Sequence, residues 1–126
     1  MRLAVLADVH GNLPAFEAAL DHVSRQGVDR IVLAGDLVVG CPDSAACWHL
    51  ACSLGGSMLR GNHERYVACY DTPEADPRWY TEQYAPVQWG VSQLTDSERD
   101  AMRALPLHLR FADAPELLFV HASPRS

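Results

Sequence analysis

The chain has 126 residues, of which 48% are hydrophobic and 21% are charged, so it can bury the core of one domain. Its formal net charge of −6 argues against sequence-independent binding to nucleic acid, which needs a basic face. The four cysteines match neither a zinc-knuckle spacing nor a secreted disulfide framework, so we expect reduced thiols. The first apolar run stops at Asp8, too early for a signal peptide or a membrane span, and we therefore expect a soluble cytoplasmic protein.

The first part of the chain alternates between short apolar runs, which are typical of buried strands, and amphipathic segments, which are typical of helices. Asn12 can cap the first helix and Gly27 can end it. The expected elements are strands at 2–7, 30–34 and 57–60 and helices at 12–26 and 43–56. This β-α-β-α-β order predicts a largely parallel sheet covered by helices.

The second part of the chain is less regular. Prolines and acidic residues predict a loop at 71–77, and the aromatic-rich segment 78–91 is expected to be mostly helical. A capping-box pattern, T-x-x-E, predicts a helix at 95–105, which a proline then ends. Two apolar segments, 107–112 and 116–121, are joined by DAPE and predict a β-hairpin.

Polar residues follow the predicted strands at the point where each strand ends. They are Asp8-Val9-His10-Gly11, Gly35-Asp36, Gly61-Asn62-His63-Glu64 and His121. The carboxyl ends of parallel strands meet at one edge of a sheet, and we expect the last strand to end there too. Carboxylate, amide and imidazole groups suit Mn, Fe, Zn or Ni, and Asp36 could bridge two ions about 3.5–4 Å apart, an arrangement that promotes attack at phosphorus. Asp8 and His10 could share an ion only if the backbone turns between them, and Gly11 makes such a turn plausible.

Each of these residues also has a simpler structural explanation. The simpler roles are helix capping for Asp8 and Asn62, an ordinary turn for Gly35-Asp36, first-turn positions for His63 and Glu64, and a surface position for His121. We assign Cys41, His22, His49 and His108 to packing or structural roles, because they lie away from this pattern or lack a neighbouring base. What favours the metal site is the joint position of the other residues at strand ends.

Taken in order, these motifs resemble the signature of the calcineurin-like metallophosphoesterases, which is D-x-H, G-D, G-N-H-[DE], a lone H and G-H-x-H. The segments LADVHGNLPAFEAAL, GDLVVGCPDS and FVHASPRS resemble the compact bacterial and archaeal branch, and the likeness runs over residues 1–126. The final G-H-x-H motif is absent from this sequence. The resemblance therefore implies a single α/β domain, residues 1–126, that forms the N-terminal portion of a four-layer α/β/β/α sandwich.

The resemblance also implies two divalent metal ions, of which Mn is the first expectation and Fe, Zn, Ni or Mg are alternatives. The implied ligands are Asp8 and His10 for the first ion, Asp36 for both ions, and Asn62 and His121 for the second ion. His63 would not bind metal but would protonate the leaving oxygen or stabilise the transition state, and Arg60 would contact the phosphate. The expected activity is hydrolysis of a phosphodiester or phosphomonoester by metal-activated water.

The expected partner is a small phosphorylated substrate, with no membrane and no strong case for nucleic acid. A second function class is a binding or scaffold module with weak or no catalysis. A sandwich that lacks one half exposes apolar surface, which a partner or a second copy of the chain could cover. A third possibility is a fragment of a longer enzyme that has no role of its own.

Overall fold

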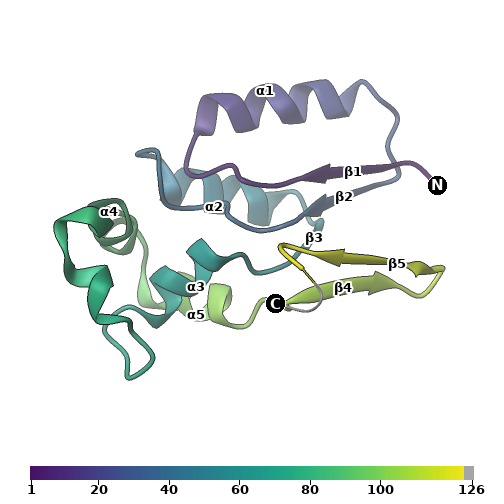
Figure 1. The fold of residues 1–126 in the computed structure, drawn as a ribbon. Coiled ribbons are helices and arrows are strands. Elements are labelled where there is room, and N and C mark those ends of the chain that lie inside the picture. Colours follow the sequence, from purple (N-terminus) through teal and green to yellow (C-terminus); the bar gives the residue numbers. More distant parts are fainter. Residues whose placement is uncertain (124–126) are drawn as a thin grey trace.

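The computed structural model describes residues 1–123 (Figure 1). Its strands are β1 (Leu3–Leu6), β2 (Arg30–Leu33), β3 (Ser57–Met58), β4 (His108–Phe111) and β5 (Ala114–Val120). Its α-helices are α1 (Leu13–Ser24), α2 (Ser44–Ser53), α3 (Asn62–Cys69), α4 (Ala85–Gln93) and α5 (Asp96–Arg103), and two short 3₁₀ helices, η1 (Pro77–Tyr80) and η2 (Glu82–Tyr84), precede α4. None of the helices within this described part has the length and apolar character needed to cross a bilayer.

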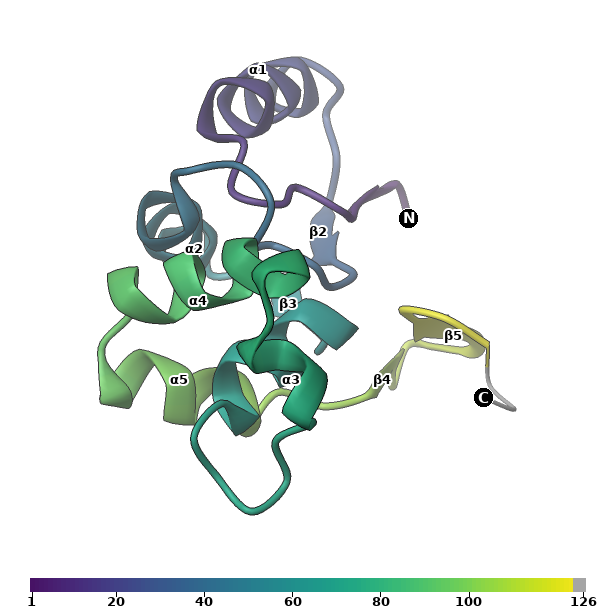
Figure 2. The same cartoon turned by 60° about the vertical axis from the view of Figure 1, so that its left-hand side comes forward.

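The first three strands form a parallel sheet in the order β1-β2-β3, in which Leu3 pairs with Arg30 and Val32 with Ser57. β4 and β5 form a separate antiparallel hairpin. Helices α1 and α2 lie on one side of the parallel sheet and the hairpin lies on the other (Figure 2). The expected parallel sheet covered by helices is confirmed, and the hairpin begins a further layer beyond it.

Several element boundaries differ from the sequence-based expectation. β3 has only two residues, because Leu59 still donates its N–H to Leu33 O but the next N–H on the side of β2, that of Gly61, donates to Glu64 Oε2 instead. α2 ends at Ser53, shortly before Gly55, whose φ of +63° takes the chain out of the helix. The segment expected to be mostly helical is divided into η1, η2 and α4, and β5 begins at Ala114, inside the expected turn.

The loop after β2 is buried, which is unusual for a connecting segment. Asp36, Leu37, Val38 and Val39 are each at most 3% exposed. Buried backbone N–H groups need acceptors, and secondary structure supplies none here. The N–H of Val39 donates to Ser44 Oγ at 2.9 Å. The N–H groups of Asp36, Leu37 and Val38 donate to one carboxylate.

That carboxylate belongs to Glu64, which is completely buried in the first turn of α3. Its Oε2 accepts N–H groups from Asp36 at 2.8 Å and Gly61 at 2.9 Å, and its Oε1 accepts from Leu37 at 2.6 Å and, more weakly, from Val38 at 3.4 Å. Burial raises the pKa of Glu64. The N–H donors oppose this shift, and the charge of the nearby Asp36 adds to it. Glu64 therefore ties the loop after β2 to the start of α3.

Replacing Glu64 by Gln should destabilise the fold. The side-chain volume stays the same, but both carboxylate oxygens accept N–H groups, so an amide NH₂ at either position faces a donor. One unsatisfied buried donor costs about 1–3 kcal/mol. We expect Glu64→Gln to lower the urea midpoint by a corresponding amount, whereas Glu17→Gln on the exposed surface of α1 should leave the midpoint unchanged. Equal midpoints for the two variants would contradict this role for Glu64.

Candidate metal centre

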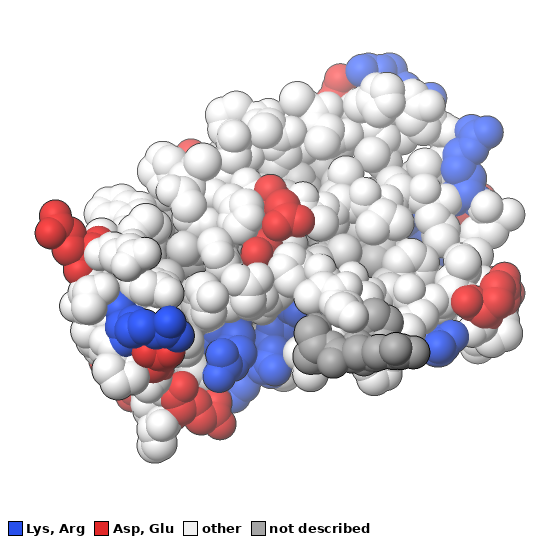
Figure 3. Space-filling view, viewed as in Figure 1, with Lys and Arg blue, Asp and Glu red and all other residues white. Residues whose placement is uncertain are grey.

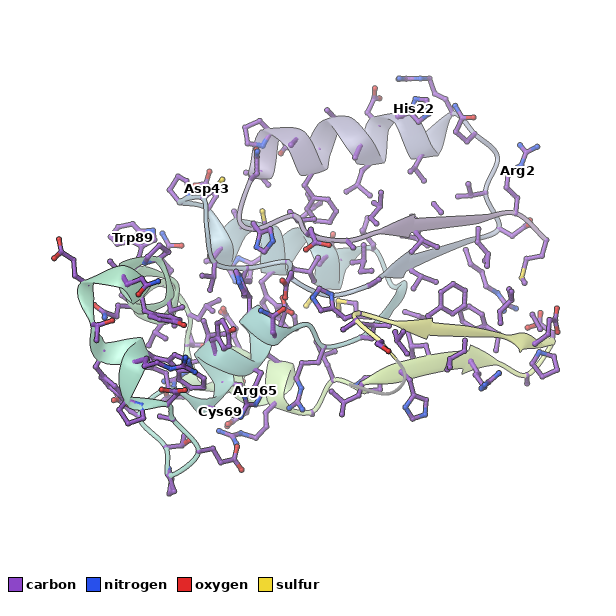
Figure 4. The ribbon with its side chains drawn as sticks, viewed as in Figure 1. Arg2, His22, Asp43, Arg65, Cys69 and Trp89 are labelled. Carbon is purple, nitrogen blue, oxygen red and sulfur yellow. The ribbon has the colours of Figure 1, made fainter. Side chains whose placement is uncertain are left out.

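The loops that follow β1 and β2 are held side by side by backbone hydrogen bonds. The N–H groups of Asp8, His10 and Gly11 donate to the carbonyls of Gly35, Asp36 and Leu37, at 3.0, 2.9 and 2.9 Å. The end of β5 reaches the same place, since His121 Nδ1 lies 2.8 Å from Ala34 O. The prediction that the last strand ends at the carboxyl edge of the parallel sheet is therefore confirmed. Side chains from these segments and from the start of α3 meet there (Figure 4).

The backbone at this edge adopts left-handed conformations that non-glycine residues rarely take. The φ angles are 59° at Asp8, 51° at His10, 55° at Asp36 and 68° at Val39. Each such residue costs on the order of 1–3 kcal/mol and persists only where its surroundings fix it. We expected a turn between Asp8 and His10 made possible by Gly11, but Asp8 and His10 themselves adopt the turn conformation.

The five predicted metal ligands lie close together around Asp36. His10 Nε2 is 3.3 Å from Asp8 Oδ1 and 3.8 Å from Asp36 Oδ2. On the other side of Asp36, His121 Nε2 is 3.3 Å from Oδ2 and 3.0 Å from Asn62 Oδ1. The side chain of Asp36 is only 5% exposed, whereas that of Asp8 is 60% exposed. Asp36 is thus the buried, central member of the group.

The two histidines turn the same ring nitrogen to this centre. His10 Nδ1 lies 3.0 Å from Val39 O, and His121 Nδ1 lies 2.8 Å from Ala34 O. A carbonyl oxygen accepts only, so Nδ1 is the donor in each contact and Nε2 is the nitrogen that faces the carboxylates. A hydrogen bond from the other ring nitrogen to a carbonyl is a common way to orient a metal-binding histidine.

The amide oxygen of Asn62 also faces this centre. It lies beside His121 Nε2 and both Asp36 oxygens, so acceptors face acceptors. Turning the amide over would let its NH₂ donate to His121 and to Asp36, at 3.0–3.3 Å. A cation would instead favour the oxygen. The chemistry of this donor set fits divalent metal ions that take oxygen and imidazole ligands.

Two triads of potential ligands can be drawn from this cluster, and both include Asp36. One triad is His10, Asp36 and His63, and the other is Asp8, Asp36 and His121; within each, the ligand atoms lie within 4.8 Å of one another. The shared carboxylate is what the expected bridging role requires. His63 lies nearer to potential metal ligands than its expected non-ligating role demands, because its ring centroid is 4.6 Å from that of His10.

His63 is also held by the loop after β2. Its N–H donates to Asp36 Oδ1 at 2.9 Å, and its Nδ1 lies 3.4 Å from Val39 O. The ring packs beside Tyr66, with centroids 5.3 Å apart. This position at the border of the ligand cluster suits either a ligand or a proton donor.

Two glycines allow the segments to approach so closely. A Cβ on Gly61 would lie 2.1 Å from Asp36 Oδ1, and a Cβ on Gly35 would lie 2.7 Å from both His121 Nδ1 and Gly61 N. Sequence reasoning included these glycines in motifs but did not identify this packing role. The sequence analysis placed Glu64 in the first turn of a helix but did not identify its anchoring role. The one signal for that role was the position of Glu64 directly after Asn62-His63 in the motif.

Comparisons with known proteins show the family of the chain. Solved structures that resemble the chain include a metallophosphoesterase from Sphaerobacter thermophilus (TM-score 0.70, 27% identity, 90% of this chain and 44% of that one) and a candidate diadenosine tetraphosphatase (TM-score 0.72, 25% identity, 97% of this chain and 50% of that one). The uncharacterized protein MJ0912 of Methanocaldococcus jannaschii is 25% identical over 126 aligned positions, and the match covers 98% of this chain and 50% of that protein. The chain thus spans about half the length of these relatives. Residues 1–125 match the calcineurin-like phosphoesterase family, and the chain belongs to that family.

Proposed function

We propose that this chain contributes a two-metal centre that hydrolyses a phosphodiester or phosphomonoester. The observation that carries the proposal is the buried Asp36 carboxylate, whose Oδ2 lies 3.8 Å from His10 Nε2 on one side and 3.3 Å from His121 Nε2 on the other. We assign Asp8 and His10 to one ion, Asn62 and His121 to the other, and Asp36 to both. The relatives are about twice as long as this chain, so their activities cannot be assigned to it by similarity alone. Hydrolysis is therefore our proposal.

When bound, the divalent ions would supply an activated water and offset the charge of the phosphoryl oxygens. Mn is the metal we propose first, with Fe, Zn, Ni and Mg as alternatives that the same donors accommodate. The chain's own part is to hold the donors in place: the carbonyls of Val39 and Ala34 fix the rings of His10 and His121. The ions would also be needed to attract the phosphate, because in the protein alone the site is lined by the carboxylates of Asp8 and Asp36, which repel an anion.

We assign His63 to proton transfer to the leaving oxygen. Its ring is half-buried at the edge of the cluster, and the contact between its Nδ1 and Val39 O would leave Nε2 for the substrate. The peptide N–H of His63 fixes the Asp36 carboxylate, so the backbone at this position supports metal binding even when the side chain is changed.

The role assignment predicts different effects for two matched substitutions. Asp36→Asn should reduce the metal content well below the roughly two ions per chain expected for the wild type, because it weakens both sites. His63→Asn should keep most of the metal, because its backbone N–H remains. Elemental analysis after dialysis with Mn²⁺ measures both. Comparable loss of metal in the two variants would mean that His63 is a ligand rather than a proton donor.

The proposal also predicts hydrolysis of a generic aryl phosphodiester in the presence of Mn²⁺. A chelator should abolish the activity, and His63→Ala should lower kcat by about 10²–10⁴-fold, the usual contribution of a general acid. His22→Ala on the exposed surface of α1 is the matched control and should behave as the wild type. Wild-type activity no higher than that of His63→Ala would refute the enzymatic proposal for this chain.

The substrate and the setting are further parts of the proposal. One structural relative is named as a candidate diadenosine tetraphosphatase, which supports a small phosphorylated substrate but does not choose one. All four cysteines are free, which supports a cytoplasmic location where thiols stay reduced.

A binding role is the second candidate function, and exposed apolar side chains favour it. Val5 on β1 is 51% exposed and Leu117 on β5 is 36% exposed, although both lie in strands. Among the described strands β5 pairs only with β4, so its other edge is open to pairing. We propose a second copy of the chain as the occupant of this apolar surface.

This second candidate predicts a dimer in solution at high concentration, measured by light scattering. Introducing a charge at the apolar surface, as in Leu117→Arg, should restore the monomer, whereas Glu116→Arg at the exposed neighbouring position should not. A strictly monomeric wild type at the highest attainable concentration would rule out this role.

A further inference from the structure

A cavity of about 710 Å³ adjoins the candidate metal centre, and Asn62 and His121 form part of its wall. Its apolar side is formed by Leu107, Leu118 and Val120, of which Leu107 is 61% exposed and Leu118 is 38% exposed. The volume is in the range of sites that hold small organic ligands. The cavity therefore lies where the part of a substrate beyond the reacting phosphate would extend.

Three arginines, Arg60, Arg65 and Arg110, also line this cavity. Elsewhere in the described part most arginines are paired with carboxylates, as Arg25 is with Asp21 and Arg30 with Asp113. Among residues 1–123, the three cavity arginines form no ion pair with a carboxylate, and Arg2 is the other described arginine without one. In a chain with a net charge of −6, this gathers three guanidinium groups without a direct carboxylate contact along one cavity.

The contacts that these arginines do make leave donors for a ligand. Arg110 donates to Pro115 O at 2.6 Å, and Arg60 donates only weakly, at 3.4 Å, to Arg103 O. The Nε of Arg60 is buried without a hydrogen-bond partner. Arg65, which projects from α3 (Figure 4), lies over the ring of Trp79 at 5.8 Å. The guanidinium donors of Arg65 and Arg110 are the ones that a ligand in the cavity can reach, because both side chains are exposed.

Two of the charged areas on this side of the molecule are neighbours. On the face drawn in Figure 3, one group of acidic atoms lies near the middle and basic atoms lie below it, while further acidic atoms lie towards the left and right ends. The acidic centre suits metal ions, whereas guanidinium groups bind phosphate directly through paired N–H donors. A ligand that used both areas would place one phosphate at the metal centre and another beside the arginines.

We propose that the arginine-lined cavity binds a second phosphate group of the substrate, so that the preferred substrates are organic oligophosphates rather than simple monoesters. The inference rests on the proposed function, because it takes the metal centre as the place of the reacting phosphate. The apolar wall formed by Leu107 and Leu118 would contact the organic part of the same molecule.

The test compares two probes that differ by one phosphate group: adenosine monophosphate and α,β-methylene adenosine diphosphate, which resists hydrolysis. Calorimetric titration into the Mn²⁺-loaded chain measures the affinity for each. We expect the wild type to bind the diphosphate at least tenfold more tightly, because a charge-assisted hydrogen bond to a phosphate typically contributes that much. Equal affinities for the two probes would overturn the inference.

Variants assign the preference to the arginines. The double variant Arg65→Ala with Arg110→Ala should lose the preference for the diphosphate, whereas Arg65→Lys with Arg110→Lys should keep part of it. Arg25→Ala, which removes an exposed arginine directly after α1, should keep all of it. Both cavity residues are exposed, so their removal should leave thermal unfolding unchanged. A preference that persists in the double alanine variant would refute the role of these arginines.

The failure of this inference can be told apart from a failure of the proposed function. Binding of the two probes needs no turnover, so it is measured even in an inactive chain. Hydrolysis of an aryl phosphodiester without any diphosphate preference would refute the cavity inference alone. A diphosphate preference in a chain without hydrolysis would support the cavity and refute the enzymatic proposal.

Discussion

The buried carboxylate of Glu64 is the interaction on which the candidate site depends. It accepts N–H groups from the loop after β2 and from Gly61 before α3, and these are the two segments that carry Asp36 and Asn62. A buried carboxylate is costly unless its oxygens are satisfied, and here several backbone donors satisfy both of them. The interaction therefore fixes the spacing between the segments as well as contributing to stability.

The strained backbone of the site follows from this anchoring. Asp8, His10 and Asp36 all have positive φ angles, and the hydrogen bonds between their two loops hold them there. The absence of a side chain at Gly35 and Gly61 lets His121 and Asp36 approach these loops closely. Donor atoms arranged by such interlocking contacts lose little freedom when a ligand binds, and this preorganisation is what a metal centre needs.

The meeting of the candidate ligands at one edge could be predicted from the sequence, because it follows from the geometry of a parallel sheet. Parallel strands end at one edge, so polar residues at those ends must meet, as Asp8, Asp36 and Asn62 do. The helix at 95–105 and the hairpin were also found, since their capping and turn signals are local. The division of 78–91 into two 3₁₀ helices and α4 was not predicted, because it depends on packing against distant elements.

The role of Glu64 and the arginine-lined cavity were beyond sequence reasoning for the same physical cause. A glutamate in the first turn of a helix is ordinary, and only the tertiary structure shows that its partners are 26–28 residues away. Likewise, Arg60, Arg65 and Arg110 are unremarkable beside arginines that pair with acids close in the sequence, as Arg25 does with Asp21 and Arg78 with Asp76. Only the position of the hairpin shows that they line one cavity, because it brings Arg110 beside Arg60 and Arg65.

The hairpin thus connects the two parts of the site. At the end of β5 it supplies His121, whose Nε2 faces Asp36 and Asn62, and at β4 it supplies Arg110 and its cavity wall. It is held to the parallel sheet at its far end, where Arg30 pairs with Asp113 and lies over the ring of Phe111. Because a single hairpin carries both a candidate metal ligand and a cavity arginine, a shift of the hairpin relative to the sheet would move the two together. Metal binding and the recognition of a second phosphate would then depend on the same packing of the hairpin against the parallel sheet.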